Sequence, residues 1–281
     1  MKKLIIPAIA LLSAAACSHP KLTESQEYYV GRSVAANAMF DKGGSYIGLY
    51  SDKDLEDYVA LVGLAVALES DRPETFKGYK FGILASDDIN AFAAPGGFVF
   101  VTTGAIKQMQ NEDELAGVLA HEIGHVNLRH PEDHANRAAD QSGSMSALQG
   151  ASGLFALGLA ATGRARSAEQ LQTLTKGLGG IADTFTKELM VNGYGRDSEL
   201  AADALGVQVL CRSGVRYNPS ALKGFIARLP KKERGAWATH PELDGRLQAM
   251  DEAISKQGPA AAVDPSRTAR FKAATAGLRG Q

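Results

Sequence analysis

The motif that most constrains this chain is His-Glu-Ile-Gly-His at residues 121–125. On a helix, residues four apart lie on one face, so His121 and His125 can direct two imidazoles at one ion while Glu122 reaches a water bound to that ion. Neutral imidazoles suit Zn²⁺. Two unrelated surface histidines are the alternative, but with 6 histidines in the chain the motif arises by chance in on the order of one in a hundred such sequences. The motif therefore predicts a zinc site on a helix.

The residues around the motif predict where this helix begins and ends. Asn111 followed by Glu114 is a capping-box pattern, and apolar residues at helical spacing continue from there through the motif. Pro131 disfavours helical backbone in the residue before it, so we expect the helix to end at His130. We expect His130 and His134, near this helix end, to be solvated.

The number of protein ligands separates catalytic from structural zinc sites. A catalytic site uses three and keeps one position for water, whereas a structural site uses four, so at least one ligand is needed beyond the two histidines. In a metzincin, Gly and His would follow the second histidine at fixed steps. Leu128 and Pro131 stand at those positions, which excludes that class.

The better candidate for the third ligand is Glu199. It precedes Asp203 by four residues, in a segment with the small and apolar residues of a buried helix, so the two carboxylates share a face. Glu199 can bind the metal while Asp203 accepts the free N–H of a ligating imidazole, which we assign to His121. Arg196, three residues before Glu199, can orient a carboxylate or cover the helix.

Composition and the N-terminus indicate an exported globular protein. Of the 281 residues 45% are hydrophobic and 22% charged, and the net charge of −1 gives no indication of nucleic-acid binding. Two lysines, an apolar run and small residues predict a signal peptide over residues 1–16. Cleavage before Cys17 would resemble bacterial lipoprotein processing, with lipid on that cysteine, although Ala14 replaces the usual Leu. Ordinary signal-peptidase cleavage after the alanine run is the alternative.

The rest of the chain divides by periodicity and composition. Helical spacing predicts helices over 22–40 and 54–69, and short β-prone runs at 79–85 and 97–101 predict a small sheet.

Two segments differ from this pattern. Residues 141–164 are rich in Gly, Ala and Ser, and we expect a buried hairpin, a mobile lid or a membrane-touching loop. Residues 258–281 are rich in Ala, Pro and Gly and are expected to form a flexible C-terminal tail. The metallopeptidase domain is therefore predicted to span 17–257.

Together these motifs resemble a known family. The runs HEIGH, ELAAD, INAFAAPGGFVFVTTGAI and THPELDGR are similar to those of the zinc peptidases related to HtpX, Oma and the CAAX prenyl endopeptidase, most of all to the exported bacterial lipoprotein branch. The resemblance covers roughly residues 22–255. It implies an α+β, mainly helical gluzincin fold with a small mixed sheet, one Zn²⁺ per chain bound by His121, His125 and Glu199, and endopeptidase activity. This sequence lacks the transmembrane helices of those relatives, which argues against membrane-embedded substrates.

The resemblance also implies a substrate-binding strand. Asn90, Ala91, Phe92 and Ala93 match the family's edge strand beside the zinc, to which an extended polypeptide can add through main-chain hydrogen bonds. For Phe92, simple core packing is the alternative.

His240 and Pro241, together with Arg246, match a further motif of the family near the active site. Without the resemblance His240 would be read as a water-exposed histidine at a helix start. The resemblance implies either an oxyanion stabiliser or a removable fourth zinc ligand.

The implied function is a zinc-dependent endopeptidase of the bacterial periplasm or outer membrane. Its expected substrates are misfolded or unassembled envelope proteins, with outer-membrane assembly proteins as further partners, lipid on Cys17 as the membrane contact, and no nucleic acid. A chaperone-like envelope assembly factor that retains the zinc site, or a cell-wall amide hydrolase, are the alternatives. The chaperone-like protein would tolerate loss of Glu122, because that residue is not a ligand.

Overall fold

The computed structural model describes residues 21–39, 47–150, 168–212, 216–229, 240, 243–257 and 264–279. The predicted signal peptide, Cys17 and residues 151–164 of the lid-like segment lie outside the described residues.

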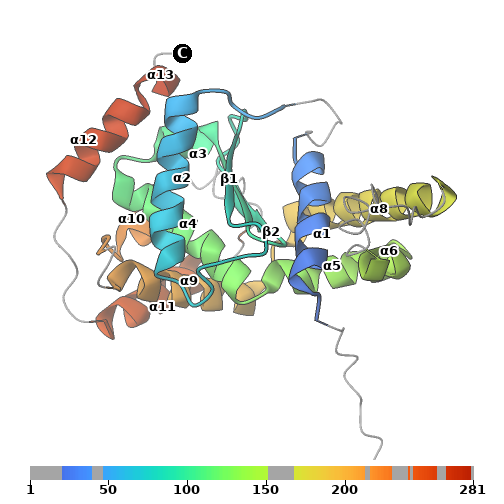
Figure 1. The fold of residues 1–281 in the computed structure, drawn as a ribbon. Coiled ribbons are helices and arrows are strands. Elements are labelled where there is room, and N and C mark those ends of the chain that lie inside the picture. Colours follow the sequence, from blue (N-terminus) through green and yellow to red (C-terminus); the bar gives the residue numbers. More distant parts are fainter. Residues whose placement is uncertain are drawn as a thin grey trace, which may run out of the picture.

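Helices make up most of the described chain, and a small sheet lies among them (Figure 1). In order, the helices are α1 (Glu24–Asn37), α2 (Lys53–Leu68), α3 (Thr103–Gln108), α4 (Glu112–Asn127), α5 (His130–Gln141), α6 (Met145–Gly150), α8 (Ala168–Asn192), α9 (Arg196–Cys211), α10 (Ala221–Arg228), α11 (Leu243–Ser255), α12 (Pro265–Ala274) and α13 (Ala276–Arg279). The strands are β1 (Lys80–Leu84), β2 (Ala91–Ala94) and β3 (Phe98–Thr102). None of the helices in the described part of the chain is long and apolar enough to cross a membrane.

The sheet is mixed, with the strand order β1-β3-β2. β3 pairs parallel with β1 and antiparallel with β2, so β2 forms one edge. The turn from β2 to β3 requires glycine at Gly96, because its φ is +75° and an added Cβ would lie 2.7 Å from the Cα of Tyr28 in α1. This arrangement confirms the predicted fold class, a mainly helical α+β domain with a small mixed sheet.

The sheet separates two apolar cores, because side chains alternate along each strand. Val99 and Val101 pack into the core that holds α2 and α4, whereas Phe98 and Phe100 pack into the core that holds α1, α5 and α8. Phe92 joins the second core and stacks on Phe100 with ring centroids 5.2 Å apart. The alternative for Phe92, core packing, is therefore what the structure shows.

Helix α4 carries the zinc motif and is buried on all sides. Asn111 caps it as predicted, since its side chain accepts a hydrogen bond from the backbone N–H of Glu114, and every residue from Glu112 to Val126 is buried. The helix ends at Asn127, and a turn at Leu128 and Arg129 leads into α5. A helix that is buried all round lies at the centre of its domain.

The expectation of a flexible tail is wrong for residues 264–279. These residues form α12 and α13, and Phe271 is fully buried against the core of α2 and α4. Arg270 makes two hydrogen bonds, of 2.7 and 2.9 Å, to Glu112 in the first turn of α4. Arg267 binds Asp113 of the same turn at 2.9 Å. The composition of this segment, rich in small residues, gave no sign of the buried Phe271 or of the ion pairs that Arg267 and Arg270 form with the acidic first turn of α4.

The described part of the lid-like segment is helical. Residues 141–150 complete α5 and form α6, where Leu148 is fully buried. α6 packs beside α8. In Figure 1, α5, α6 and α8 lie together on the side of the molecule opposite α12. The lid function of 141–164 stays a prediction.

Candidate metal centre

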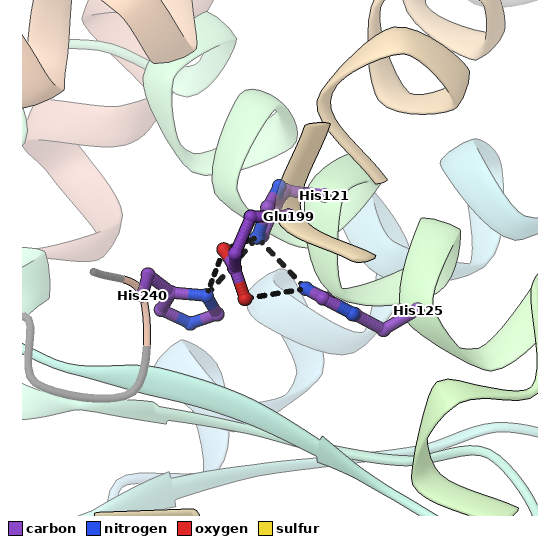
Figure 2. A group of neighbouring side chains, drawn as sticks. All are labelled: His121, His125, Glu199 and His240. Carbon is purple, nitrogen blue, oxygen red and sulfur yellow. Dashed lines mark hydrogen bonds and ion pairs between the residues drawn. The ribbon is translucent and has the colours of Figure 1, made fainter. Parts of the chain in front are cut away.

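Helices α4 and α9 bring the three proposed ligands together (Figure 2). The Nε2 atoms of His121 and His125 are 3.0 Å apart. Nε2 of His121 lies 3.3 Å from Oε2 of Glu199, and Nε2 of His125 lies 3.5 Å from Oε1 of the same carboxylate. All three side chains are fully buried. Three donor atoms therefore face one point inside the domain.

A glycine between the two histidines allows this close approach. An added Cβ at Gly124 would lie 2.9 Å from the carbonyl oxygen of Ala202, so a larger residue would push α9 away from α4. Glu199 on α9 would then lie too far from His121 and His125 on α4. The small residues of the two motifs thus set the distance between the helices that carry the donors.

His240 supplies a fourth donor atom to the same cluster. Ligand atoms of His121, His125, Glu199 and His240 all lie within 4.8 Å of one another. Nδ1 of His240 is 2.8 Å from Oε2 of Glu199 and 3.2 Å from Nε2 of His121. Burial alone would lower the pKa of His240, but the charges of Glu199 and Glu122 outweigh it and raise that pKa to about 10. In this arrangement His240 is buried beside the donors, in contrast to a water-exposed histidine.

Two buried side chains, Asp203 and Arg246, lie on the side of His121 that faces away from the cluster. Nδ1 of His121 is 2.8 Å from Oδ1 of Asp203, without the alignment of a hydrogen bond, and Arg246 of α11 binds both oxygens of Asp203 at 2.7 and 2.8 Å. Nη1 of Arg246 also lies 3.1 Å from Oε2 of Glu199. Asp203 thus takes the place that we expected beside His121.

The arginine that contacts the carboxylates is Arg246, and of the two roles open for Arg196 the structure fits the second, covering the helix. Arg196 is exposed at the first residue of α9, with its guanidinium beside Gly245, whereas Arg246 is buried and contacts the site. Arg196 is the first residue of α9, at the end of the helix, and its side chain stays at the surface although Glu199, one turn later, is buried. An arginine from a different helix therefore holds the carboxylates.

The expectation that His130 and His134 are solvated is wrong. His134 is 2% exposed, its Nε2 lies 3.2 Å from the carbonyl oxygen of Phe185, and burial lowers its pKa to about 4. His130 is half-buried, and its Nδ1 lies 2.8 Å from Nδ1 of His125. The left-handed turn at Arg129 brings His130, the first residue of α5, against His125 of α4, which the sequence pattern did not indicate.

Glu122 lies in the same buried cluster and is 0% exposed. Among the described residues neither of its oxygens has a hydrogen-bond partner, nor has Oε1 of Glu199. Oε1 of Glu122 is 3.2 Å from Nε2 of His240, without the alignment of a hydrogen bond. Buried carboxylate oxygens without partners are costly. Their grouping around the imidazole nitrogens fits a divalent cation.

The electrostatics of Glu199 agree with this fit. Burial would raise the pKa of Glu199, but the charges of His240 and His125 and hydrogen bonds from His121 and His240 hold it well below its usual range. The carboxylate is therefore ionised, as a metal ligand must be.

The outer edge of β2 is already paired within the chain. Thr102 N–H donates to the carbonyl of Asn90, so alternate residues Ala91 and Ala93 direct their main-chain groups away from β3. Ala91 N–H donates to Oδ1 of Asn90, and the carbonyl of Ala91 lies 3.1 Å from Nε2 of His240. The Tyr194 hydroxyl donates to the carbonyl of Ala93 at 2.6 Å. An added strand must displace these partners.

Tyr194 is a site residue that the sequence reading missed. Besides its bond to Ala93, its ring lies over His125, with centroids 4.4 Å apart and planes tilted by 35°. The signal that could have revealed it is its place, directly before the Gly-Arg that opens α9.

Comparisons with known proteins agree with this geometry. A family model described as Peptidase family M48 matches residues 54–254. The chain is 29% identical over 220 residues to a beta-barrel assembly-enhancing protease of Yersinia pestis, covering 75% of this chain and 41% of that protein. It is 32% identical over 206 residues to a beta-barrel assembly-enhancing protease of Escherichia coli K12, covering 71% and 39%. Metalloprotease YcaL of the same strain is 28% identical over 200 residues, covering 69% of each chain. The chain thus spans about two fifths of the length of the first two relatives.

Proposed function

The chain belongs to peptidase family M48, and on this premise we propose that it is a zinc-dependent endopeptidase of the bacterial envelope that cleaves misfolded or unassembled proteins. The observation that carries the proposal is the buried cluster of His121, His125 and Glu199 around the carboxylate of Glu122, whose oxygens have no hydrogen-bond partner in the described structure. Two imidazoles and one carboxylate are the ligand set of a catalytic zinc site.

One Zn²⁺ per chain would be held by His121, His125 and Glu199. When bound, it supplies Lewis-acid chemistry that polarises a scissile carbonyl and lowers the pKa of water. Asp203 would keep the proton of His121 on Nδ1, which leaves Nε2 free to bind metal. Arg246 holds the pKa of Asp203 below its usual value and also contacts the carboxylate of Glu199.

Glu122 is the proposed general base. Its carboxylate lies beside the ligands without being one of them, because it follows His121 directly and reaches the cluster from the next position on the helix. It would take the proton of the attacking water and later pass it to the leaving amine. Its complete burial keeps bulk water from competing for that proton.

The structure corresponds, in this proposal, to a closed form of the site. Nδ1 of His240 faces the ligands, where a fourth protein ligand would take the position of the reacting water. The opposite nitrogen of the ring lies at the carbonyl of Ala91, on the edge that an extended substrate would use. A substrate strand would displace His240 from both positions at once. Asn90, Ala91, Phe92 and Ala93 remain the proposed substrate strand, with Phe92 contributing through its backbone.

The proposed cellular location is supported by the names of the relatives and by the N-terminal sequence. Two relatives carry the words beta-barrel assembly-enhancing in their names, and the predicted signal peptide and Cys17 favour export with a lipid anchor. We therefore propose a periplasmic or outer-membrane location, unfolded envelope polypeptides as substrates and outer-membrane assembly proteins as partners. Cell-wall amide hydrolysis is the second candidate, because the same zinc chemistry serves it.

The experiment that tests the proposal measures zinc content and the cleavage of casein and of a muropeptide by the purified chain. We expect one zinc per chain, casein cleavage and no muropeptide cleavage. Glu199→Ala should lower zinc occupancy, because three ligands become two. Muropeptide cleavage without casein cleavage would favour the amide hydrolase, and a metal-free active protein would refute the proposal.

A further inference from the structure

The second zinc ligand is contacted by another histidine. His125 directs Nε2 at the cluster, and its opposite nitrogen, Nδ1, lies 2.8 Å from Nδ1 of His130. The two rings are inclined by 66°, with centroids 5.0 Å apart, so the contact joins the edges of the rings and is not a stack. His125 also has the Tyr194 ring over its face. Its orientation is therefore fixed on two sides.

We propose that His130 is a positioning residue for His125. A neutral imidazole that binds metal through Nε2 carries its proton on Nδ1, and this proton needs an acceptor. The only atom that the described structure places at hydrogen-bond distance from Nδ1 of His125 is Nδ1 of His130. That nitrogen accepts through its lone pair, so His130 carries its own proton on Nε2. The inference rests on the proposed zinc site.

The backbone between the two histidines is shaped for this contact. Arg129 joins α4 to α5 in the left-handed region, at φ 61° and ψ 23°, which is uncommon for a residue other than glycine. Its guanidinium binds Glu27 of α1 at 2.6 Å and also Glu132 of α5. These two buried carboxylates hold the turn, and the turn places His130 directly at the N-terminus of α5, facing back to α4.

The two ligating histidines are thus supported in different ways. Asp203, a carboxylate paired with Arg246, lies at Nδ1 of His121, whereas the imidazole of His130 lies at Nδ1 of His125. A carboxylate at position 130 would add a further negative charge to a cluster that already contains Glu122 and Glu199. A histidine supplies the acceptor without that charge.

The test compares two substitutions of His130 in the metal-free full chain. His130→Leu removes the acceptor, whereas in His130→Asn the amide oxygen takes a position close to that of Nδ1 and keeps it. Zinc affinity is measured by competition with a chelator, and the visible spectrum of the cobalt-substituted protein reports ligand geometry. His134→Leu is the matched control, a histidine one turn further along α5 that contacts Phe185 and Tyr194 but no proposed ligand.

We expect His130→Leu to weaken zinc binding by about 10- to 100-fold and to change the cobalt spectrum, and His130→Asn to restore both to near wild type. His134→Leu should lower thermal stability and leave zinc affinity unchanged. Wild-type affinity in His130→Leu, or equal loss in the Leu and Asn variants, would overturn the positioning role while leaving the proposed function intact. A wild-type chain that binds no zinc would overturn both.

Discussion

Arg246 donates two hydrogen bonds to the carboxylate of Asp203, from Nε to Oδ2 at 2.7 Å and from Nη2 to Oδ1 at 2.8 Å. Both side chains are buried, with about 1% of their surface exposed. Parallel bonds from one guanidinium fix the plane of the carboxylate, and hence the direction from which it meets His121. Removing one member of such a pair leaves an uncompensated buried charge.

Arg246→Met should therefore destabilise the metal-free protein by about 3–5 kcal/mol and also weaken zinc binding. Urea unfolding with and without zinc measures both effects. Arg246→Lys should recover little, since an ammonium cannot bind both oxygens in one plane. The double variant Arg246→Met, Asp203→Asn should recover part of the stability. A single variant as stable as wild type would show that the pair does not hold the site.

His240→Ala should raise the cleavage of an unfolded protein by zinc-saturated enzyme. The substitution opens both the fourth ligand position and the edge at Ala91, and the rate rises about tenfold if the closed form is favoured by about 1.4 kcal/mol. Initial rates on casein at fixed zinc measure this. A fall in kcat by about 10² to 10³ with zinc retained would instead identify His240 as an oxyanion stabiliser.

Tyr194→Phe should change stability and substrate binding in opposite directions. The variant keeps the ring over His125 but leaves the carbonyl of Ala93 without its donor, at a cost of about 1–3 kcal/mol in the free protein. A substrate strand would restore that hydrogen bond, so KM should fall while the melting temperature falls as well. A higher KM at the same zinc content would indicate that the hydroxyl binds substrate.

Phe271→Ala should destabilise the protein by about 3–5 kcal/mol, because a fully buried ring is removed from the core beneath α12. Chemical denaturation measures the change, and Lys272→Ala, exposed on the same helix, is the control that should have little effect. If the free energy of unfolding changed by less than about 1 kcal/mol, α12 would be only loosely attached to the domain.

Local patterns in the sequence predicted much of the fold. The N-cap at Asn111, the helices that became α1 and α2 and the strands that became β1 and β3 depend on periodicity and turn residues, which act over a few positions. The second bond of the predicted capping box is not made, because the carboxylate of Glu114 accepts from the backbone N–H of Gln110 instead. The fold class followed from these elements and from the family resemblance.

The contacts that the sequence did not reveal join distant segments. Arg246 and Asp203 are 43 residues apart in the sequence, and Tyr194 and Ala93 are 101 residues apart. Which of two arginines faces inward depends on how α9 and α11 pack, and no local pattern carries that information. The contact of His130 was missed for the same reason, because the left-handed backbone at Arg129 is held by an ion pair with Glu27 of α1, which is 102 residues away in the sequence.

We propose that Glu122 performs proton transfer at a zinc site, and the variant Glu122→Gln is the test of this role. Zinc content and casein cleavage are measured on the wild type, on this variant and on Glu56→Gln, an exposed change on α2 that should alter neither. We predict that Glu122→Gln keeps the fold and the zinc of the wild type but loses cleavage by several orders of magnitude, because the base is removed and no ligand is touched. Proteolysis at the wild-type rate in zinc-replete Glu122→Gln would contradict the account.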